Sequence, residues 1–245
     1  MSKVCVVCTS DIDDTCRYCS HCGAIQSQKV VTDTDHSWST LKQAAIFYSW
    51  EVVSCCFFTF YKDIQTLLGL VIFNLFTALV TGYFVKLNLT NLKASLLWRH
   101  FELKKLLIYG VIAITAAIFV HYATGWLNLN IFYTDNSYYP FFKPHRYGAA
   151  LMVLFTAILP ALFEELAYRG YLLQTLSEVM DGQQAIFITS VLFALVHLSF
   201  LSLVWLIPFA LWLGIIALKE KTIWYGVAIH FLFNLTACMF EIFAL

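Results

Sequence analysis

The chain carries very little charge. Of its 245 residues, 12% are Asp, Glu, Lys or Arg, whereas 60% are hydrophobic. Soluble domains carry about 25% charged residues, so this sequence has about half of the charge that coats a water-facing surface. This composition excludes a soluble globular enzyme and a disordered protein. It indicates a helical membrane protein with several spans.

Three further features are absent. Lys and Arg do not outnumber Asp and Glu, since there are 15 of each, so no basic surface attracts nucleic acid and no nucleic-acid partner is expected. Residues 1–40 contain no apolar run, so we expect no signal peptide at the start of this sequence. Alternating segments of about 10 residues, which a lipid-facing barrel needs, do not occur. The expected fold class is therefore an all-α, polytopic transmembrane bundle.

Seven segments are candidates for membrane spans, because a helix needs about 20 apolar residues to cross about 30 Å of hydrocarbon. The fifth is short, which indicates a helix that is broken or partly buried in the bundle. The expected spans are residues 44–61, 66–85, 106–126, 147–166 with a possible extension to 176, 184–197, 200–218 and 222–243.

The distribution of Lys and Arg predicts the orientation of these spans, since cytoplasmic loops are enriched in both. Seven spans with a cytoplasmic N-terminus place most of the basic residues inside: Lys3, Arg17, Lys29, Lys42, Lys86, Lys93, Arg99, Lys104, Lys105, Lys219 and Lys221. The opposite side keeps Lys62, Lys143 and Arg146. We therefore expect an integral membrane protein whose N-terminus is cytoplasmic.

Five of the eight cysteines lie within the first 22 residues. Cys5 and Cys8 form one CxxC turn, and Cys19 and Cys22 form a second. Two such turns complete a tetrahedral four-sulfur site, and a short segment without a core of its own needs the folding free energy that a metal supplies. A cytoplasmic location keeps thiols reduced, which favours metal over disulfides. We predict a structural zinc site at residues 1–24, a linker at 25–43 and the bundle at 44–245.

This N-terminal segment resembles the zinc ribbons at the ends of many bacterial membrane proteins, including Tyr18 before the second turn and Gly23 after it. It departs from the pattern at Thr9, where a Gly is usual, and at Cys16, an extra thiol that could compete as a ligand. Iron in the same cage and a thiol redox switch are alternatives to zinc. The cysteines within the apolar spans are interpreted as core residues: Cys55, Cys56 and Cys238.

Ionisable side chains are costly inside a bilayer and are concentrated here in the last four spans. Glu165 and Arg169 are four residues apart, so they can pair on one helix face. Glu164 lies about 100° round the helix from Glu165 and can point at a different cavity. A poorly solvated carboxylate in that place suits general-base chemistry.

Two other polar groups come from later spans. His197 ends one apolar segment, and His230 and Asn234 present one face of the last span. Taken singly, the Glu165–Arg169 pair could be a salt bridge and His197 a helix-end histidine. His230 and Asn234 could be interhelical hydrogen-bond partners. Taken together, they could surround one water molecule from three helices. Three other ionisable residues are interpreted as structural or interfacial: Glu51, His121 and Glu241.

Residues 147–240 carry a recognisable motif set: Glu164-Glu165-x-x-x-Arg169, Phe193-x-x-x-His197 and His230-x-x-x-Asn234. This set resembles the CPBP family, which comprises CAAX prenyl proteases of the Ras-converting type and bacterial bacteriocin-processing or immunity relatives. The resemblance implies an intramembrane endopeptidase. It implies that Glu164 and His197 activate water, that His230 and Asn234 stabilise the oxyanion, and that Glu165 and Arg169 organise the site or contact the substrate.

The sequence leaves the role of a catalytic metal open. It has no HExxH motif, and a water activated by glutamate accounts for the same residues as a zinc ion held by Glu and two His. The expected partners are the lipid bilayer and a protein or peptide substrate. The zinc-ribbon resemblance suggests the cytoplasmic membrane of a bacterium. The alternatives are a catalytically silent immunity or scaffold protein and a proton-coupled transporter.

Overall fold

The computed structural model describes residues 2–5, 7–13, 19–24, 34–98, 101–132 and 137–243. The chain divides into two compact units, Met1–Ser37 and Trp38–Leu245. Of the expected linker at 25–43, residues 25–33 lie outside the described ranges, as do Cys16 and Tyr18, whereas residues 34–43 belong to helix α1 (Thr34–Phe60).

The first unit contains a small antiparallel hairpin. Strand β1 (Ser2–Val4) pairs with β2 (Asp11–Asp13), with Lys3 opposite Ile12. The side chains of Cys5, Ile12 and Cys19 are its buried apolar centre. Such a centre is too small to hold a fold by itself, so the hairpin needs another source of stability.

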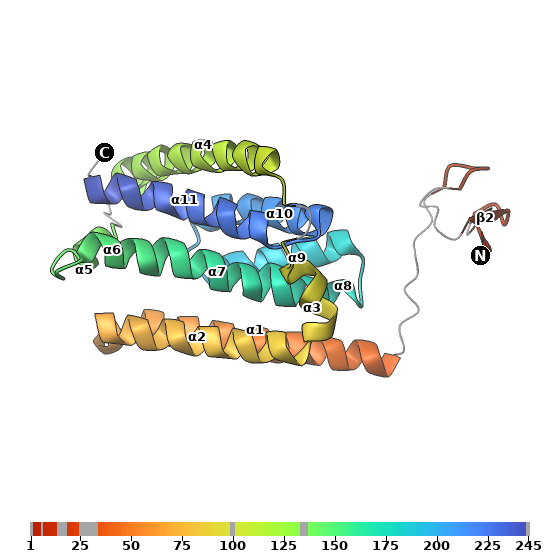
Figure 1. Cartoon of the computed structure of the whole chain (residues 1–245), viewed down its shortest axis with the longest axis horizontal. Coiled ribbons are helices and arrows are strands. Elements are labelled where there is room, and N and C mark those ends of the chain that lie inside the picture. Colours follow the sequence, from red (N-terminus) through yellow and green to blue (C-terminus); the bar gives the residue numbers. More distant parts are fainter. Residues whose placement is uncertain are drawn as a thin grey trace. The chain divides into compact units, whose positions relative to one another are not determined.

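The second unit is a helical bundle, which confirms the predicted fold class (Figure 1). Its long helices are α1 (Thr34–Phe60), α2 (Leu67–Leu87), α4 (Leu103–Leu127), α9 (Gly182–Leu195), α10 (Leu203–Glu220) and α11 (Trp224–Phe243). The shorter elements are the 3₁₀ turn η1 (Lys62–Ile64), α3 (Leu89–Leu96), the π-helical η2 (Asn128–Phe132) and α5 (Tyr139–Phe142).

One further helix is a composite of α- and π-helical turns between Gly148 and Ser177. It consists of α6 (Gly148–Met152), η3 (Val153–Ile158), α7 (Leu159–Glu165), η4 (Leu166–Leu172) and α8 (Leu173–Ser177), of which η3 and η4 are π-helical. Pro160 removes one backbone donor from this helix, which favours such irregular turns. Turns of this kind are frequent at functional sites.

Five of the described helices are long and apolar enough to cross a membrane: 67–87, 103–131, 148–177, 203–220 and 224–243. These match five expected spans, and the fourth does extend beyond residue 166. Helix α1 is long but less apolar, and α9 has 14 residues, about 21 Å of helix. The total of seven spans stays a prediction.

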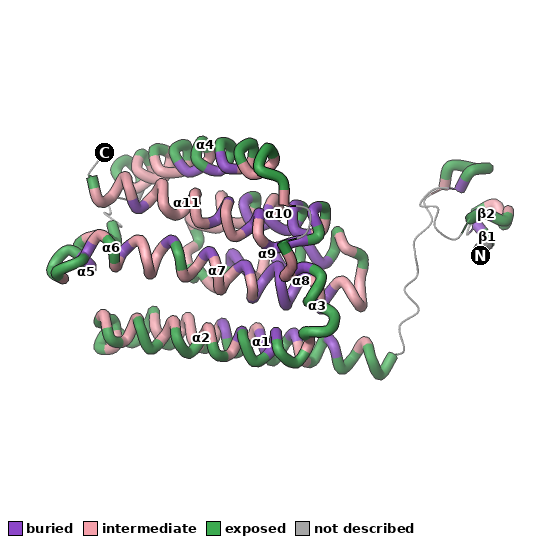
Figure 2. The backbone as a smooth tube through the Cα atoms, in the orientation of Figure 1, coloured by how far each residue is buried: buried purple, intermediate pink, exposed green. Residues whose placement is uncertain are grey.

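The bundle surrounds the composite helix. Phe47 of α1 packs against Phe84 of α2 and Tyr171 of η4, at ring-centroid distances of 5.3 and 4.8 Å. Helix α11 contacts α4 on one side and η3 and α7 on the other (Figure 1). Buried residues concentrate where these helices meet (Figure 2). Helices α1, α2 and α4 also carry large apolar side chains that are exposed, as lipid contact requires.

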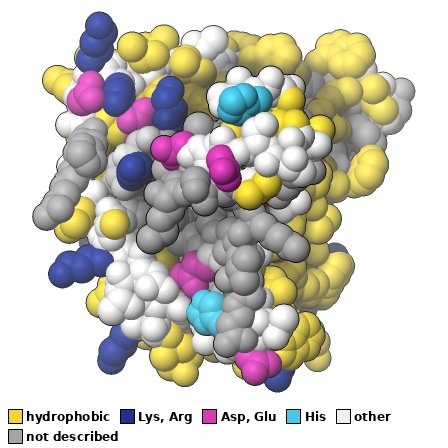
Figure 3. Space-filling model, turned by 90° about the vertical axis from the view of Figure 1, so that its right-hand side faces the viewer, with side chains coloured by type: hydrophobic (Ala, Val, Ile, Leu, Met, Phe, Trp, Pro, Cys, Tyr) yellow, Lys and Arg dark blue, Asp and Glu magenta, His cyan; other side chains and the backbone are white. Residues whose placement is uncertain are grey.

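One end of the bundle brings together several connecting segments. The loop before α11 bonds to the end of α3, through Ile223 N–H and Ser95 O at 3.0 Å, and Lys105 Nζ lies 2.8 Å from Glu220 Oε2. Figure 3 faces this end, where Lys and Arg side chains are visible beside hydrophobic flanks. The basic residues on these segments are Lys86, Lys93, Lys104, Lys105, Lys219 and Lys221.

Candidate active site in the bundle

A buried ion pair stands where α7 passes into η4. Arg169 Nη1 lies 2.8 Å from Glu165 Oε1, and both side chains are almost fully buried. This is the pair that the four-residue spacing predicts. Arg169 Nη2 also donates to the Ala210 carbonyl at 3.1 Å, and its guanidinium lies 4.6 Å from the Phe193 ring centroid. The extra hydrogen bond helps to offset the cost of burying both charges.

Glu165 also orients His230. The Nδ1 atom of His230 lies 3.0 Å from Glu165 Oε1. A carboxylate accepts hydrogen bonds, so the ring hydrogen is on Nδ1, and Nδ1–H donates a hydrogen bond to Glu165. The Nε2 atom then faces Glu164, with 3.9 Å to Oε2, which is longer than a direct hydrogen bond. Glu165 therefore holds one imidazole in place while Glu164 remains available.

Gly226 makes room for this carboxylate. It lies one helical turn before His230 on α11, so both residues present one face to α7. A Cβ atom at Gly226 would come 2.6 Å from Glu165 Oε2, which is closer than atoms in contact allow. The sequence motif does not include Gly226, and a single glycine in an apolar span carries no signal that would have revealed this role.

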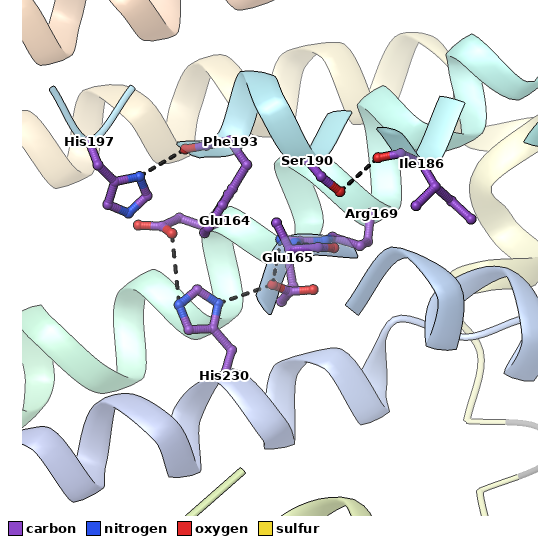
Figure 4. A network of polar contacts seen from close by, with 9 residues as sticks. Glu164, Glu165, Arg169, Ile186, Ser190, Phe193, His197 and His230 are labelled. Atoms are coloured by element: carbon purple, nitrogen blue, oxygen red, sulfur yellow. Dashed lines mark hydrogen bonds and ion pairs between the residues drawn. The ribbon is translucent and has the colours of Figure 1, made fainter. Parts of the chain in front are cut away.

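His197 lies in the turn after α9. Its Nδ1 atom is 2.8 Å from the Phe193 carbonyl, which can only accept, so Nδ1 donates and Nε2 keeps its lone pair. Figure 4 shows His197 and His230 on either side of the Glu164 carboxylate. Phe193 packs against both imidazoles, at ring-centroid distances of 4.9 and 6.0 Å. The structure thus brings Glu164 of α7, His230 of α11 and His197 of the turn after α9 together.

The turn at residues 196–202 follows α9, whose 14 residues make about 21 Å of helix, less than the thickness of the hydrocarbon layer. It contains His197, and Ser202 Oγ and Ser199 Oγ lie 2.8 Å apart. Non-helical backbone at membrane depth occurs where it is covered by protein or lines a water-filled cavity. His197 is exposed within this turn and lies next to the Glu164 carboxylate (Figure 4).

Asn234 has a structural contact that the sequence did not predict. Its Nδ2 atom donates to the Thr156 carbonyl at 3.0 Å. That carbonyl would accept from the residue four positions later in a regular helix, but Pro160 has no N–H. Asn234 therefore replaces a missing backbone bond, and this contact is with η3 rather than with Glu164 or an imidazole. The second N–H of its amide is left for another acceptor.

The residues interpreted as structural have the following surroundings. His121 stacks on Phe240 at 4.2 Å. Glu241 accepts hydrogen bonds from Ser137 Oγ and from the backbone N–H groups of Tyr138 and Tyr139, at 2.7–2.9 Å. Glu51 differs, because it is buried on the α1 face that packs against η4.

The four N-terminal cysteines form the predicted cluster. Their Sγ atoms all lie within 4.8 Å of one another, with 3.7 Å between Cys5 and Cys22 and 3.6 Å between Cys8 and Cys19. A zinc ion with bonds of about 2.3 Å in a tetrahedron spaces its sulfurs by about 3.8 Å. The four cysteines are therefore placed to hold a metal ion, and the spacing fits zinc.

Backbone N–H groups favour the metal-binding form of one of these thiols, that of Cys5. Those of Cys8 and Val7 point at Cys5 Sγ, each at 3.5 Å, and lower the pKa of that thiol to about 6. A lower pKa favours the thiolate, which is the form that binds metal. Thr9 and Gly23 follow the two turns with φ of 59° and 72°. Thr9 thus adopts the left-handed conformation that a Gly adopts more easily.

Comparison with known proteins matches one segment of the chain. Residues 146–236 match the family described as "Type II CAAX prenyl endopeptidase Rce1-like". The matched segment contains Glu164, Glu165, Arg169, His197, His230 and Asn234. No curated protein and no solved structure matches the chain.

Proposed function

We propose that this chain, whose residues 146–236 form an Rce1-like domain, is an intramembrane endopeptidase that hydrolyses a peptide bond of a membrane-associated protein or peptide. The observation that carries the proposal is the position of Glu164. Its carboxylate lies between the imidazoles of His197 and His230 and forms no direct hydrogen bond with His230 (Figure 4). The family resemblance and this geometry support the same residues.

In the proposed reaction, Glu164 and His197 Nε2 hold a water molecule. Glu164 takes one proton from that water as the oxygen attacks the carbonyl carbon of the substrate. The tetrahedral intermediate then carries a negative oxygen. Glu164 returns the proton to the amide nitrogen, the carbon–nitrogen bond breaks, and a carboxylic acid and an amine are released.

The negative oxygen needs donors nearby. In its protonated form, His230 donates a hydrogen bond from Nε2 to the negative oxygen. Its Nδ1–H remains hydrogen-bonded to Glu165. The second N–H of the Asn234 amide is the other proposed donor. Glu165 and Arg169 act through His230 and are therefore positioning residues. The Nε2 atoms of both histidines and the Glu164 carboxylate are also a donor set that zinc accepts, and metal content distinguishes the two versions.

The decisive experiment compares the full chain with Glu164→Gln, both reconstituted in liposomes. Removal of a general base lowers the cleavage rate by about 10²–10⁴-fold. The membrane peptides of cells that express each form would identify the substrate by mass spectrometry. Glu178→Gln is the matched control, because Glu178 is on the bundle surface and its partner Asn91 can also donate to an amide oxygen. Undiminished cleavage by Glu164→Gln would rule out Glu164 as the base.

A second function is favoured by the separate N-terminal unit. A compact metal-binding module in the same chain as a membrane bundle suits a scaffold or immunity protein that binds other proteins. In that case Glu164→Gln leaves the cellular function intact, whereas Cys19→Ser abolishes it. The endopeptidase proposal makes the opposite prediction for Glu164→Gln.

We also propose that the protein resides in the cytoplasmic membrane of a bacterium, with its N-terminus and the Lys-rich end of the bundle on the cytoplasmic side. The excess of Lys at that end supports this orientation. The proposed ion in the cysteine module is zinc, since the reduced cytoplasm keeps its thiols available.

A further inference from the structure

Glu51 is an acid in an otherwise apolar stretch of α1, outside the segment that matches the Rce1-like family. Its side chain is 9% exposed, and no hydrogen bond or ion pair to it occurs within the described part of the chain. A buried acid without a partner is costly in a membrane, and such residues commonly face a cavity or a ligand. Glu51 therefore requires an explanation that helix packing does not supply.

The packing of α1 places Glu51 beside the candidate active site. Phe47 contacts Tyr171 at 4.8 Å, and α1 runs antiparallel to the composite helix (Figure 1). One turn forward along α1 is therefore one turn back along η4, which sets Glu51 opposite Tyr168. The electrostatic interactions agree, since Glu51 interacts with Glu164, and Tyr168 interacts with both acids.

Tyr168 supplies the second, independent observation. It is 2% exposed, its ring packs against Phe193 at 5.1 Å, and its hydroxyl has no hydrogen-bond partner among the described residues. Two other polar groups of α1 lie near it, Tyr48 and Cys55, but the Tyr48 hydroxyl donates to the Leu192 carbonyl. The neighbouring guanidinium of Arg169 is already bound to Glu165 and to the Ala210 carbonyl.

We propose that Glu51 and Tyr168 form a subsite for a primary ammonium group of the substrate, such as a lysine side chain near the scissile bond. The inference deepens the proposed endopeptidase function and rests on it. An ammonium group has three N–H donors and no acceptor. The two carboxylate oxygens of Glu51 and the Tyr168 hydroxyl oxygen are three acceptors, and the charge of Glu164 adds attraction without direct contact.

The first test measures substrate preference. Two pools of fluorogenic membrane peptides differ only in Lys or norleucine at the positions flanking the cleaved bond, and the full chain is assayed in liposomes. We expect kcat/KM for the Lys pool to exceed that for the norleucine pool by about tenfold, as one charge-assisted hydrogen bond allows. Glu51→Gln should bring the ratio close to one, and Tyr168→Phe should lower it in part.

Ser49→Ala is the matched control, because Ser49 lies on the exposed face of α1 and bonds only to its own helix, through the Ala45 carbonyl. It should keep the ratio of the unmodified chain. Equal cleavage of both pools by the unmodified chain, or a ratio that survives Glu51→Gln, overturns the subsite. Cleavage of neither pool contradicts the endopeptidase function instead.

The second test needs no catalysis. The melting temperature of the full chain in nanodiscs is measured with n-butylammonium and with n-butyltrimethylammonium, which has the same charge but no N–H donor. We expect only the primary ammonium to raise the melting temperature, and Glu51→Gln to abolish the rise. Equal effects of the two cations, or no effect of either, show that Glu51 is a buried acid that binds no ammonium group.

Discussion

The Glu165 side chain contacts residues of both helices that meet at the candidate site. One of its oxygens accepts from Arg169 and from His230, at 2.8 and 3.0 Å. The other faces Gly226. The carboxylate is completely buried, so water cannot replace a contact that is lost. Any change that moves Glu165 also moves His230, and catalysis is sensitive to displacements of about 1 Å.

Gly226→Ala tests this dependence. The added methyl group would meet Glu165 Oε2, so we expect the cleavage rate to fall by about a hundredfold and the melting temperature to decrease. Gly82→Ala is the control, since a Cβ there meets nothing within 4 Å and should leave both quantities nearly unchanged. A Gly226→Ala protein with full activity would show that the position of Glu165 is not critical.

At the scale of elements, the composite helix and α11 depend on each other. Pro160 removes the donor that the Thr156 carbonyl would have in a regular helix, and Asn234 of α11 supplies one instead. The same α11 presents Gly226 and His230 to α7. The irregular helix is therefore held in register with the helix that carries half of the site.

Asn234→Ala should cost about 1–3 kcal/mol of unfolding free energy, because it leaves the partly buried Thr156 carbonyl unpaired. Pro160→Ala restores a backbone N–H, so the double variant should regain most of that stability. If Asn234 also stabilises the oxyanion, cleavage by the double variant stays about 10²–10³-fold low. Unfolding in detergent and cleavage in liposomes measure the two effects separately. Recovery of both together would assign Asn234 a structural role alone.

At the scale of the whole molecule, the chain joins two units of different stability. The bundle buries many large apolar side chains, among them Tyr168, Tyr171 and Phe47. The N-terminal unit buries very few, so a bound metal would supply the free energy of folding. We therefore expect metal loss to affect the cysteine module and to leave the bundle folded.

Metal content tests this division and the role of metal in the reaction. The purified full chain should contain one zinc ion, and a Cys19→Ser, Cys22→Ser double variant should contain none while it keeps its cleavage activity. The measurement is elemental analysis beside the liposome assay. Zinc that persists in the cysteine variant but is lost from Glu164→Gln would place a metal at the active site and contradict the metal-free reaction.

Much of this protein follows from local properties of the sequence. Low charge and long apolar segments determine a helical membrane bundle, because each buried backbone must satisfy its own hydrogen bonds. The spacing of Glu165 and Arg169 determines that they share a helix face, and the two CxxC turns determine a four-sulfur cluster. These features depend on neighbours a few residues apart, so the sequence alone predicts them.

The tertiary structure decided what depends on contacts between distant segments. It decided that Glu165 binds His230, 65 residues away, that Gly226 leaves space for that carboxylate, and that Asn234 compensates for Pro160. It also decided that Glu51, which the sequence presents as an isolated acid in the first span, lies near enough to Tyr168 and Glu164 to interact with them electrostatically. Such pairings depend on the rotation and register of packed helices, which neither composition nor spacing along one helix specifies.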